Sequence, residues 1–375
     1  MNFSQEEKIR YARQTILPAI GQAGQAKLKA ARVLFVGAGG LGSSPAIYLA
    51  AAGVGTIGLI DADTVSLSNL HRQVLHYTCD IDKPKVISAR EKLQQINPHV
   101  KVVTYQERFS AANALTIGAD YDLVIDGTDN LPSRYLMNDA CFFLKKPLVF
   151  GGVFQFEGQV SVFGPGGPCY RCFFRELPPR DEIPSCTEAG VIGVIPGIIG
   201  LMQANEAVKL ICGIGEGLLG RLLIFDALAA RWREVKINKD PQCPLCGVHP
   251  NILKLEEPAW PECPSKEKNM IKEVSVKELK ELRDKNPGVY LLDVREEDEW
   301  ATARIEGAHL KPMSSLEGTF EDIPKDEAVY CLCHMGGRSA RVTQFLQSKG
   351  YTRVFNVRGG IHAWALEIDP TVATY

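Results

Sequence analysis

The chain has 375 residues, of which 45% are hydrophobic and 23% are charged, and its formal net charge is −2. This composition is typical of a folded globular protein, and the length favours two domains over one. A nearly balanced charge gives no basis for nucleic-acid binding. We expect no membrane partner either, because the longest apolar stretch, residues 189–202, is interrupted by glycines and Pro196 and falls short of the roughly 20 residues of a membrane span.

The first residues and the cysteines favour a cytoplasmic protein. The opening stretch MNFSQEEKIRYARQ carries acidic residues and no apolar run, so it does not resemble a secretory signal. Eleven cysteines are spread over the chain, an odd number that disfavours a disulfide framework. Metal or thiol chemistry in a reducing compartment fits them better.

The first two-thirds of the chain alternates strand-like and helical patterns. Strands are predicted over residues 31–40, 56–63, 101–109 and 121–130, with further strands over 147–154, 159–165, 222–228 and 232–238. A helix is predicted over residues 43–53, with Pro45 tolerated in its first turn. This alternation predicts an α/β fold with a mostly parallel, doubly wound, Rossmann-like sheet.

The composition changes after Cys246. Residues 247–270 are rich in proline and charge and show no clear periodicity, which is typical of a linker. A second β/α alternation follows, with helices predicted over 274–285 and 340–350 and strands over 288–295, 328–333 and 353–360. The sequence therefore predicts a large domain over 1–248, a linker over 249–271 and a smaller α/β domain over 272–375.

A glycine motif joins the first predicted strand to the helix that follows it. Gly37, Gly39, Gly40 and Gly42 form a G-x-G-G-x-G run. Such glycines permit a tight turn and let the backbone approach a phosphate at the helix N-terminus. Asp61 ends the next strand, where a carboxylate can accept hydrogen bonds from ribose hydroxyls. We therefore expect a nucleotide site, the alternative being a glycine turn without a ligand.

Polar and cationic residues follow this motif along the chain. They are Asn69, Arg72 and Lys85, with Arg13 upstream and Asp129 and Asn130 in the later motif DGTDN. Several cations suit a triphosphate better than the pyrophosphate of a dinucleotide, because each phosphate adds charge to neutralise. A carboxylate after a strand, such as that of Asp129, can hold Mg²⁺. A nucleoside triphosphate with Mg²⁺ is thus the expected ligand, while an NAD-dependent oxidoreductase and a non-catalytic scaffold stay open as alternatives.

At these motifs the sequence resembles a known family. VGAGGLGSS, LIDADTVSLSNLHRQ, KPKV and DGTDN, in this order, are similar to the MoeB/ThiF group, relatives of the ubiquitin-activating enzymes, over roughly residues 5–248. The resemblance implies ATP-dependent adenylylation of the C-terminal Gly-Gly of a small ubiquitin-fold protein. It further implies that Asp61 binds the ribose, that Gly40 lies close to the nucleotide and that Asp129 binds Mg²⁺. The phosphates would be bound by Asn69, Arg72 and Lys85. Arg13 would reach the site of the neighbouring subunit, which implies a homodimer.

Two C-x-x-C pairs predict a metal site. Cys169 and Cys172 form the first pair, and Cys243 and Cys246 form the second. Four thiolates make a closed tetrahedral set that suits structural Zn²⁺. A redox C-x-x-C or incidental cysteines are the alternatives, and MoeB-like proteins carry the same two pairs. Cys186 lies between the two pairs. The resemblance implies that it captures the activated carboxyl group as a thioester or acyl disulfide. The sequence around Cys186 by itself indicates only a thiol in a loop.

A second reactive cysteine is expected near the end of the chain. Cys333 ends the predicted strand AVYCLC, and Arg338 closes the short loop CHMGGR. The glycines let backbone N–H groups turn inward as an anion-binding nest, and the N-terminus of the following helix favours thiolate over thiol. Cys331, on the same strand face, fits a buried packing cysteine better.

The sequence around this loop resembles rhodanese modules over roughly residues 272–370. LLDVREEDEW, ARIEGAHLKPM and VFNVRGGIHAW carry the similarity. The resemblance implies that the Cys333 thiolate takes up a sulfane sulfur as a persulfide. Asp293 and Arg295 are expected to anchor the strand and loop rather than act on sulfur.

Together the two halves predict an adenylyltransferase and sulfurtransferase. The Cys333 persulfide would attack the acyl adenylate of a Gly-Gly carrier and expel AMP, and reduction of the resulting acyl disulfide would release a C-terminal thiocarboxylate. The chain as a whole resembles fused MoeB–rhodanese proteins, which implies a carrier for molybdopterin, thiamine, cysteine or tRNA thiolation. The sulfur donor would be a cysteine desulfurase persulfide or thiosulfate. The alternative enzyme would form a Cys186 thioester for protein conjugation.

Overall fold

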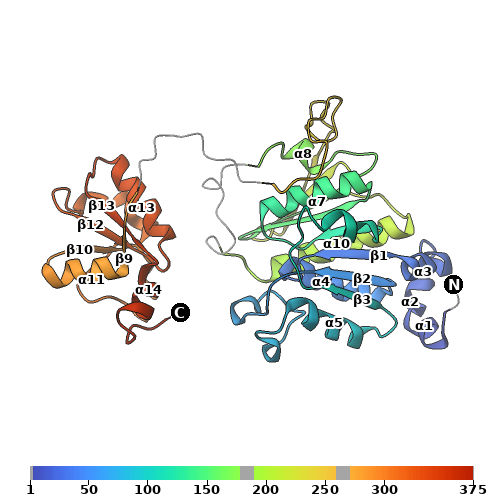
Figure 1. Ribbon diagram of the computed structural model, residues 1–375. Helices are drawn as coiled ribbons and strands as arrows, with labels where there is room; N and C mark the ends of the chain where they lie inside the picture. The colour runs from blue at the N-terminus through green and yellow to red at the C-terminus, as the bar shows by residue number, and fades with distance from the viewer. Residues whose placement is uncertain (1–2, 178–189, 259–270, 375) are drawn as a thin grey trace. The chain divides into compact units, whose positions relative to one another are not determined.

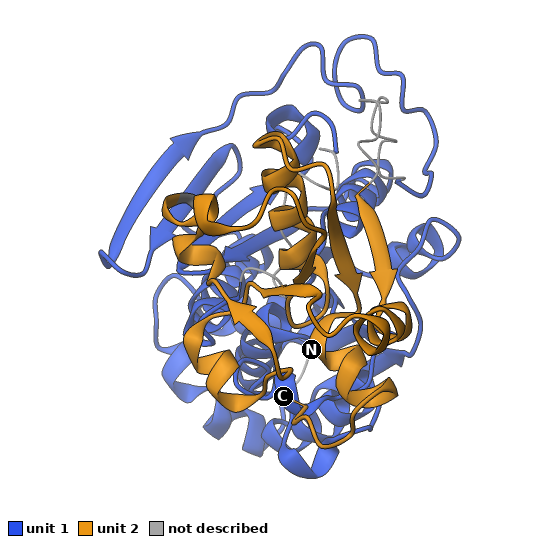
Figure 2. Ribbon diagram, turned by 90° about the vertical axis from the view of Figure 1, so that its left-hand side faces the viewer, with its two compact units in different colours: residues 1–262 blue, residues 263–375 orange. Residues whose placement is uncertain are grey.

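The computed structural model describes residues 3–177, 190–258 and 271–374, with the helices and strands arranged as in Figure 1. The chain forms two compact units, residues 1–262 and 263–375, coloured separately in Figure 2. The first unit runs past residue 248, where the composition suggested a boundary. The backbone N–H of Ala111 donates to Glu257 at 2.9 Å, and Leu255 packs against buried residues of the first unit. Part of the expected linker therefore lies on this unit.

The first unit contains a sheet of eight strands in the order β3-β2-β1-β4-β5-β6-β7-β8. The strands are β1 (Arg32–Val36), β2 (Thr56–Ile60), β3 (Lys101–Tyr105), β4 (Leu123–Asp126), β5 (Leu148–Phe154), β6 (Glu157–Phe163), β7 (Arg221–Asp226) and β8 (Arg231–Lys236). β1 to β5 pair in parallel and β6 to β8 in antiparallel fashion. The mostly parallel sheet expected from the sequence is confirmed.

Helices cover both faces of this sheet. The helices that the structure describes in this unit are α1 (Gln5–Arg10), α2 (Ala12–Thr15), α3 (Gly21–Ala30), α4 (Gly40–Ala52), α5 (Lys85–Ile96), α6 (Ala114–Ala119), α7 (Leu131–Leu144), α8 (Tyr170–Phe173) and α10 (Val194–Cys212). Successive side chains of β1 divide between two cores, because strand side chains alternate between faces. Phe35 packs in the core with residues of α4, α5 and α10, and Leu34 in the core with residues of α6 and α7. The sheet is therefore doubly wound.

The strand order fixes where a ligand can bind. β1 lies between β2 and β4, with Val36 paired to Ile60 on one side and to Asp126 on the other. The connections from β1 and β4 leave toward opposite faces of the sheet, and ligands of such folds bind in the crevice beyond the strand ends at this point. The turns after β1, β2 and β4 therefore meet at one edge.

Helix α10 is long and apolar enough to cross a membrane by length and composition alone. Core helices share these properties, and the buried residues Ile195 and Ile199 of α10 pack in the same core as residues of α4 and the sheet. Pro196, which the sequence analysis treated as an interruption, lies in the first turn of the helix. Proline is tolerated there because the first N–H groups of a helix have no intrahelical partner.

The second unit contains a parallel five-stranded sheet in the order β11-β10-β12-β13-β9. Its elements are β9 (Lys272–Ser275), α11 (Val276–Lys285), β10 (Tyr290–Asp293), α12 (Glu297–Thr302), β11 (Ala308–Leu310), β12 (Val329–Leu332), α13 (Gly337–Ser348), β13 (Val354–Arg358) and α14 (Gly360–Glu367). The helix predicted over 274–285 was wrong at its start. Ser275 caps α11 through the N–H of Glu278, so the residues before the cap are free to pair as β9.

Candidate active site

A cavity of about 400 Å³ lies at the carboxyl ends of β1, β2 and β4. Eight residues singled out from the sequence line it: Gly37, Gly39, Gly40, Asp61, Arg72, Lys85, Asp129 and Asn130. They come from separate turns that the strand order brings to one edge of the sheet. The fold thus assembles most of the expected nucleotide site in a single place.

Two glycines are required by close backbone packing. Gly37 has φ +97°, and a Cβ there would lie 2.7 Å from the carbonyl oxygen of Gly127. A Cβ on Gly42 would lie 2.3 Å from the carbonyl oxygen of Gly37. Gly42 therefore lets α4 approach the turn and is not itself among the residues that line the cavity.

The carboxylate of Asp61 is held by two backbone donors. The N–H of Ala38 donates to Oδ2 and the N–H of Asp63 to Oδ1, each at 2.8 Å. Burial raises the pKa of Asp61, while nearby Lys85 and these hydrogen bonds oppose the rise. Asp61 thus offers a fixed acceptor at the cavity, as binding of a ribose hydroxyl requires.

The cations of the cavity are already engaged with neighbouring groups. Lys85, at the start of α5, places Nζ 2.7 Å from Oδ2 of Asp63, an exposed carboxylate that also lines the cavity. Arg72 places Nη1 2.8 Å from Nε2 of His71 and donates to the carbonyl oxygen of Ser68. Asp63 was not singled out from the sequence, although it lies two residues after Asp61 in the same DAD motif.

Two expected ligands do not line the cavity. Asn69 accepts a hydrogen bond at Oδ1 from Nε2 of Gln73, and it is Gln73 that lines the cavity. Arg13 lies exposed on α2 and is likewise outside the lining. The phosphate role of Asn69 and the intersubunit role of Arg13 stay predictions.

The motif DGTDN contains two carboxylates with different surroundings. Asp129 is exposed and lines the cavity, so its carboxylate oxygens suit Mg²⁺. Asn130 uses its side-chain oxygen to cap α7 through the N–H of Ser133. Asp126, which the sequence analysis passed over, is fully buried, and its Oδ2 lies 3.2 Å from Nε of Arg134. Asp126 also accepts two hydrogen bonds from Thr128, which fixes the backbone leading to Asp129.

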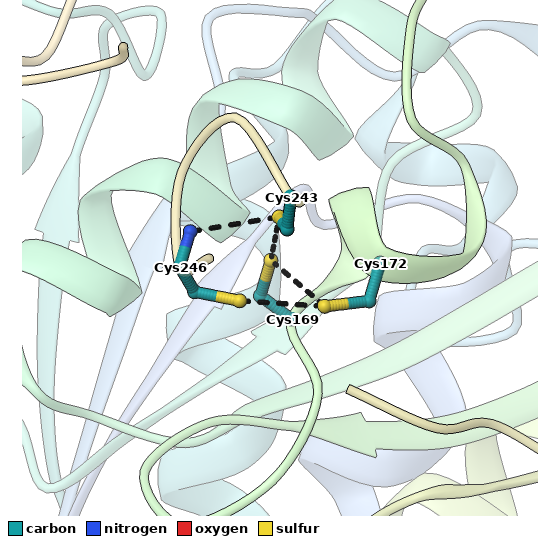
Figure 3. A group of neighbouring side chains, drawn as sticks. All are labelled: Cys169, Cys172, Cys243 and Cys246. Atoms are coloured by element: carbon teal, nitrogen blue, oxygen red, sulfur yellow. Dashed lines mark hydrogen bonds between the residues drawn. The ribbon is translucent and has the colours of Figure 1, made fainter. Parts of the chain in front are cut away.

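The four expected metal ligands form one cluster. The sulfur atoms of Cys169, Cys172, Cys243 and Cys246 lie within 4.8 Å of one another and point toward a common centre (Figure 3). Three separations are 3.5 Å for Cys169–Cys243, 3.3 Å for Cys172–Cys246 and 3.9 Å for Cys169–Cys172. A tetrahedral site with Zn–S bonds of about 2.3 Å has S–S edges of about 3.8 Å. The donor set and its spacing therefore fit Zn²⁺.

Cys333 lies at the end of β12 in the second unit, and its side chain is 1% exposed. Its Sγ accepts hydrogen bonds from the N–H of Gly336 at 3.1 Å and from Oγ of Ser339 at 3.3 Å. Gly336 has φ +98°, the conformation that turns its N–H toward the sulfur. Both donors favour a negatively charged sulfur. Cys331, two residues earlier, is a packing cysteine, as expected, and burial raises the pKa of its thiol to about 12.

Arg338 contacts a carboxylate of a neighbouring helix. Its Nη1 and Nη2 each lie 2.6 Å from one oxygen of Glu299, which belongs to α12. This bidentate ion pair ties the loop of Cys333 to α12. Asp293 and Arg295 form a fully buried ion pair, and Arg295 also donates to the carbonyl oxygen of Ala303. They anchor the end of β10. Cys186, the remaining expected catalytic residue, lies outside the described residues.

Comparison with known proteins agrees with this geometry. Residues 11–245 match the ThiF family and residues 275–367 match the rhodanese-like domain. The chain is 40% identical to the maize "Adenylyltransferase and sulfurtransferase MOCS3-1" over 98% of its own length and 83% of that protein. It is 51% identical to a Thermus thermophilus "Sulfur carrier protein adenylyltransferase" over 68% of its length and 96% of that protein. The crystal structure of Escherichia coli MccB with MccA-N7isoASN shares the fold, with a TM-score of 0.57, 22% identity and coverage of 66% of this chain and 76% of MccB.

These matches define a class of protein in which a ThiF-type domain is followed by a rhodanese-like domain. The chain belongs to the ThiF family, and it carries the rhodanese-like domain in the same polypeptide.

Proposed function

We propose that this chain adenylylates the C-terminal Gly-Gly carboxylate of a ubiquitin-fold sulfur-carrier protein and then converts it to a thiocarboxylate. The observation that carries the proposal is the presence of two complementary sites in one polypeptide. The first unit has a cavity lined by a glycine turn, by the fixed carboxylate of Asp61 and by cations that include Arg72 and Lys85. The second has a cysteine whose sulfur is surrounded by hydrogen-bond donors. The names of the relatives support the same pair of activities.

The first step makes the carboxyl group reactive. The carrier carboxylate attacks the α-phosphorus of ATP, and pyrophosphate leaves as the acyl adenylate forms. Asp61 holds the ribose, and Arg72 and Lys85 neutralise charge on the phosphates, so the protein acts mainly through positioning and electrostatics. Asp129 would hold Mg²⁺, which supplies further positive charge to the phosphates.

The second step replaces oxygen by sulfur. The terminal sulfur of a Cys333 persulfide attacks the carbonyl carbon, AMP leaves, and an acyl disulfide joins the carrier to Cys333. Attack of the Cys186 thiolate on Sγ of Cys333 then releases the thiocarboxylate and leaves a disulfide between the two cysteines. A thiol reductant restores both thiols. The names of the relatives favour this reaction over conjugation through a Cys186 thioester.

Several features of the working enzyme belong to the same proposal. The sulfur donor is a persulfide of a cysteine desulfurase or thiosulfate, and the enzyme works in the cytoplasm. It is a homodimer, which the exposed apolar residues Ile9, Ile16 and Leu17 support, since they lie near Arg13 on the N-terminal segment. Apolar side chains gathered on a surface mark protein interfaces.

Mass spectrometry of the carrier tests the proposal. Candidate small proteins ending in Gly-Gly are incubated with the chain, MgATP and a persulfide donor. The expected product has one carboxyl oxygen replaced by sulfur. Cys333→Ala should keep ATP–pyrophosphate exchange and lose the product, whereas Lys85→Ala should lose both. A normal rate of thiocarboxylate formation by the Cys333 variant would contradict the proposed division of labour.

A further inference from the structure

The surroundings of Cys333 contain a chain of hydrogen bonds that reaches the surface. Oγ of Ser339 lies 3.3 Å from Sγ of Cys333 and 2.7 Å from Oδ1 of Asn356. Nδ2 of Asn356 donates in turn to Oε1 of Glu273 at 2.8 Å. Ser339 is fully buried and Asn356 is 3% exposed, while Glu273 is exposed. Cys333 directly follows β12, and the other three residues belong to α13, β13 and β9, so the sheet order brings the four together.

Glu273 determines which end of the Asn356 amide faces Ser339. An ionised carboxylate only accepts hydrogen bonds, so it selects the NH₂ group of the amide. The amide oxygen of Asn356 is thereby directed to Ser339, where it too can only accept. The orientation of a buried amide follows here from a charged residue at the surface.

Ser339 has one hydroxyl hydrogen and more than one acceptor for it. The acceptors within hydrogen-bond distance are Sγ of Cys333, Oδ1 of Asn356 and the carbonyl oxygen of Gly336. With a neutral thiol, the hydroxyl donates to Asn356, and the S–H of Cys333 can donate to Oγ. With a thiolate, the hydroxyl turns to the sulfur, because hydrogen bonds to charged acceptors are about twice as strong as neutral ones.

We propose that Ser339 is a positioning residue for Cys333: its hydroxyl, held by Asn356 and Glu273, switches its hydrogen to the sulfur when the thiol ionises. This inference rests on the proposed sulfurtransferase function. In the step that loads the enzyme, the Cys333 thiolate attacks the outer sulfur of a donor persulfide. A new S–S bond forms at Sγ, the S–S bond of the donor breaks, and the donor leaves as a thiolate that takes up a proton. Ser339 raises the fraction of Cys333 that is ready for this attack.

Other ionisable groups surround the loop and are unchanged in the test variants. They are His334 in the loop, Cys331 on β12, Arg338 on α13, Glu299 on α12, His362 on α14, and Asp293 and Arg295 at the end of β10. Because they stay in place, a shift that follows from Ser339 alone is assigned to the hydroxyl.

The test measures the rate at which iodoacetamide alkylates Cys333 as a function of pH, with the modified peptide quantified by mass spectrometry. Ser339→Ala should raise the pH at the midpoint of this profile by about one unit. The reason is that the free energy of one hydrogen bond to a charged group corresponds to roughly one pH unit. Sulfur transfer at neutral pH should fall about tenfold with the thiolate fraction. The matched control is Thr343→Val, which removes another fully buried hydroxyl of α13, one that donates to the carbonyl oxygen of Ser339. It should leave the profile unchanged.

A second variant changes only the exposed end of the chain of hydrogen bonds. Glu273→Ala frees the Asn356 amide to turn its NH₂ group toward Ser339, which removes a competing acceptor for the hydroxyl. The midpoint of the alkylation profile of Cys333 should then move to lower pH, and a move to higher pH would overturn the proposal. Equal shifts in Ser339→Ala and Thr343→Val would also overturn it. The alkylation profile requires neither ATP nor a carrier protein, so it tests the role of Ser339 independently of the proposed function. Failure of the wild-type enzyme to make thiocarboxylate would contradict the proposed function and would leave the alkylation result valid.

Discussion

Nε2 of His76 lies 2.9 Å from the carbonyl oxygen of Ala38, the residue between Gly37 and Gly39 of the nucleotide turn. Nδ1 of His76 lies 2.9 Å from Oγ of Ser88 on α5. The N–H of the same Ala38 donates to Asp61. Both polar groups of Ala38 are therefore held, one by a buried imidazole and one by the carboxylate proposed to bind ribose, and the turn is fixed before any nucleotide binds.

Replacing His76 should weaken nucleotide binding. His76→Gln disrupts the hydrogen bond to the carbonyl oxygen of Ala38. Loss of a buried hydrogen bond of this kind costs about 1–2 kcal/mol, so we expect KM for ATP to rise about tenfold. ATP–pyrophosphate exchange measures the effect. His249→Gln, at an exposed histidine, is the control and should leave KM unchanged.

The same residue should make stability depend on pH. Burial lowers the pKa of His76 from its ordinary value of 6.5. Below pH 6.5 the unfolded chain binds a proton that the folded chain does not, so the folded state loses stability as the pH falls toward the lower folded pKa. The Tm of the wild type should therefore decrease more than that of His76→Gln between pH 7 and pH 5.5. Parallel decreases would show that His76 is not responsible.

The cysteine cluster should contribute zinc-dependent stability. Cys172→Ser removes one ligand of the proposed tetrahedral site, and we expect zinc content to fall from about one ion per chain to near zero. The Tm should fall as well, because metal binding at such a site contributes to the free energy of folding. Elemental analysis and thermal unfolding measure the two effects. Cys79→Ser, at an exposed cysteine outside the cluster, should retain both zinc and Tm.

The Asp126–Arg134 ion pair should matter far more than a pair at the surface. Asp126 is fully buried and Arg134 is partly buried, and Asp126→Asn leaves the Arg134 charge without its carboxylate. Removing one partner of a buried ion pair costs about 3–5 kcal/mol of unfolding free energy. Urea unfolding measures this loss. Asp120→Asn breaks an exposed contact with Arg32 and should cost less than about 1 kcal/mol. Similar losses in the two variants would contradict the assigned role of Asp126.

Much of the architecture follows from local sequence signals. Apolar runs ending in glycine or aspartate predict the parallel strands, and the two C-x-x-C pairs predict a cluster that the structure brings together. In DGTDN, however, the pattern does not tell which carboxylate is buried. Asp126 is still part of β4 and faces the interior, whereas Asp129 lies three residues beyond the strand. That distinction depends on where the strand ends, which sequence patterns locate poorly.

The partners of charged side chains are harder still to predict. Arg338 was expected to close the loop of Cys333, but no sequence pattern indicated that its guanidinium would contact Glu299 on α12. The two residues are far apart in the sequence and meet only because β10 and β12 are neighbours in the sheet. Lys85 and Asp63 meet for a similar reason, since the turn after β2 lies against the start of α5. Such pairs follow from tertiary packing and leave no periodic signal.

The Arg338–Glu299 pair leads to a prediction that separates support of the loop from direct action on sulfur. Glu299→Gln replaces a bidentate, charge-assisted contact by a neutral one, which should loosen the loop that presents Gly336 N–H and Ser339 to Cys333. We expect sulfur transfer from a persulfide donor to fall about tenfold, as for the loss of about 1.4 kcal/mol, while ATP–pyrophosphate exchange in the first unit stays normal. Glu297→Gln, at an exposed position of the same helix, is the matched control and should transfer sulfur at the wild-type rate. If Glu299→Gln is fully active while Arg338→Ala is not, the guanidinium acts on the donor itself and its ion pair with α12 is incidental.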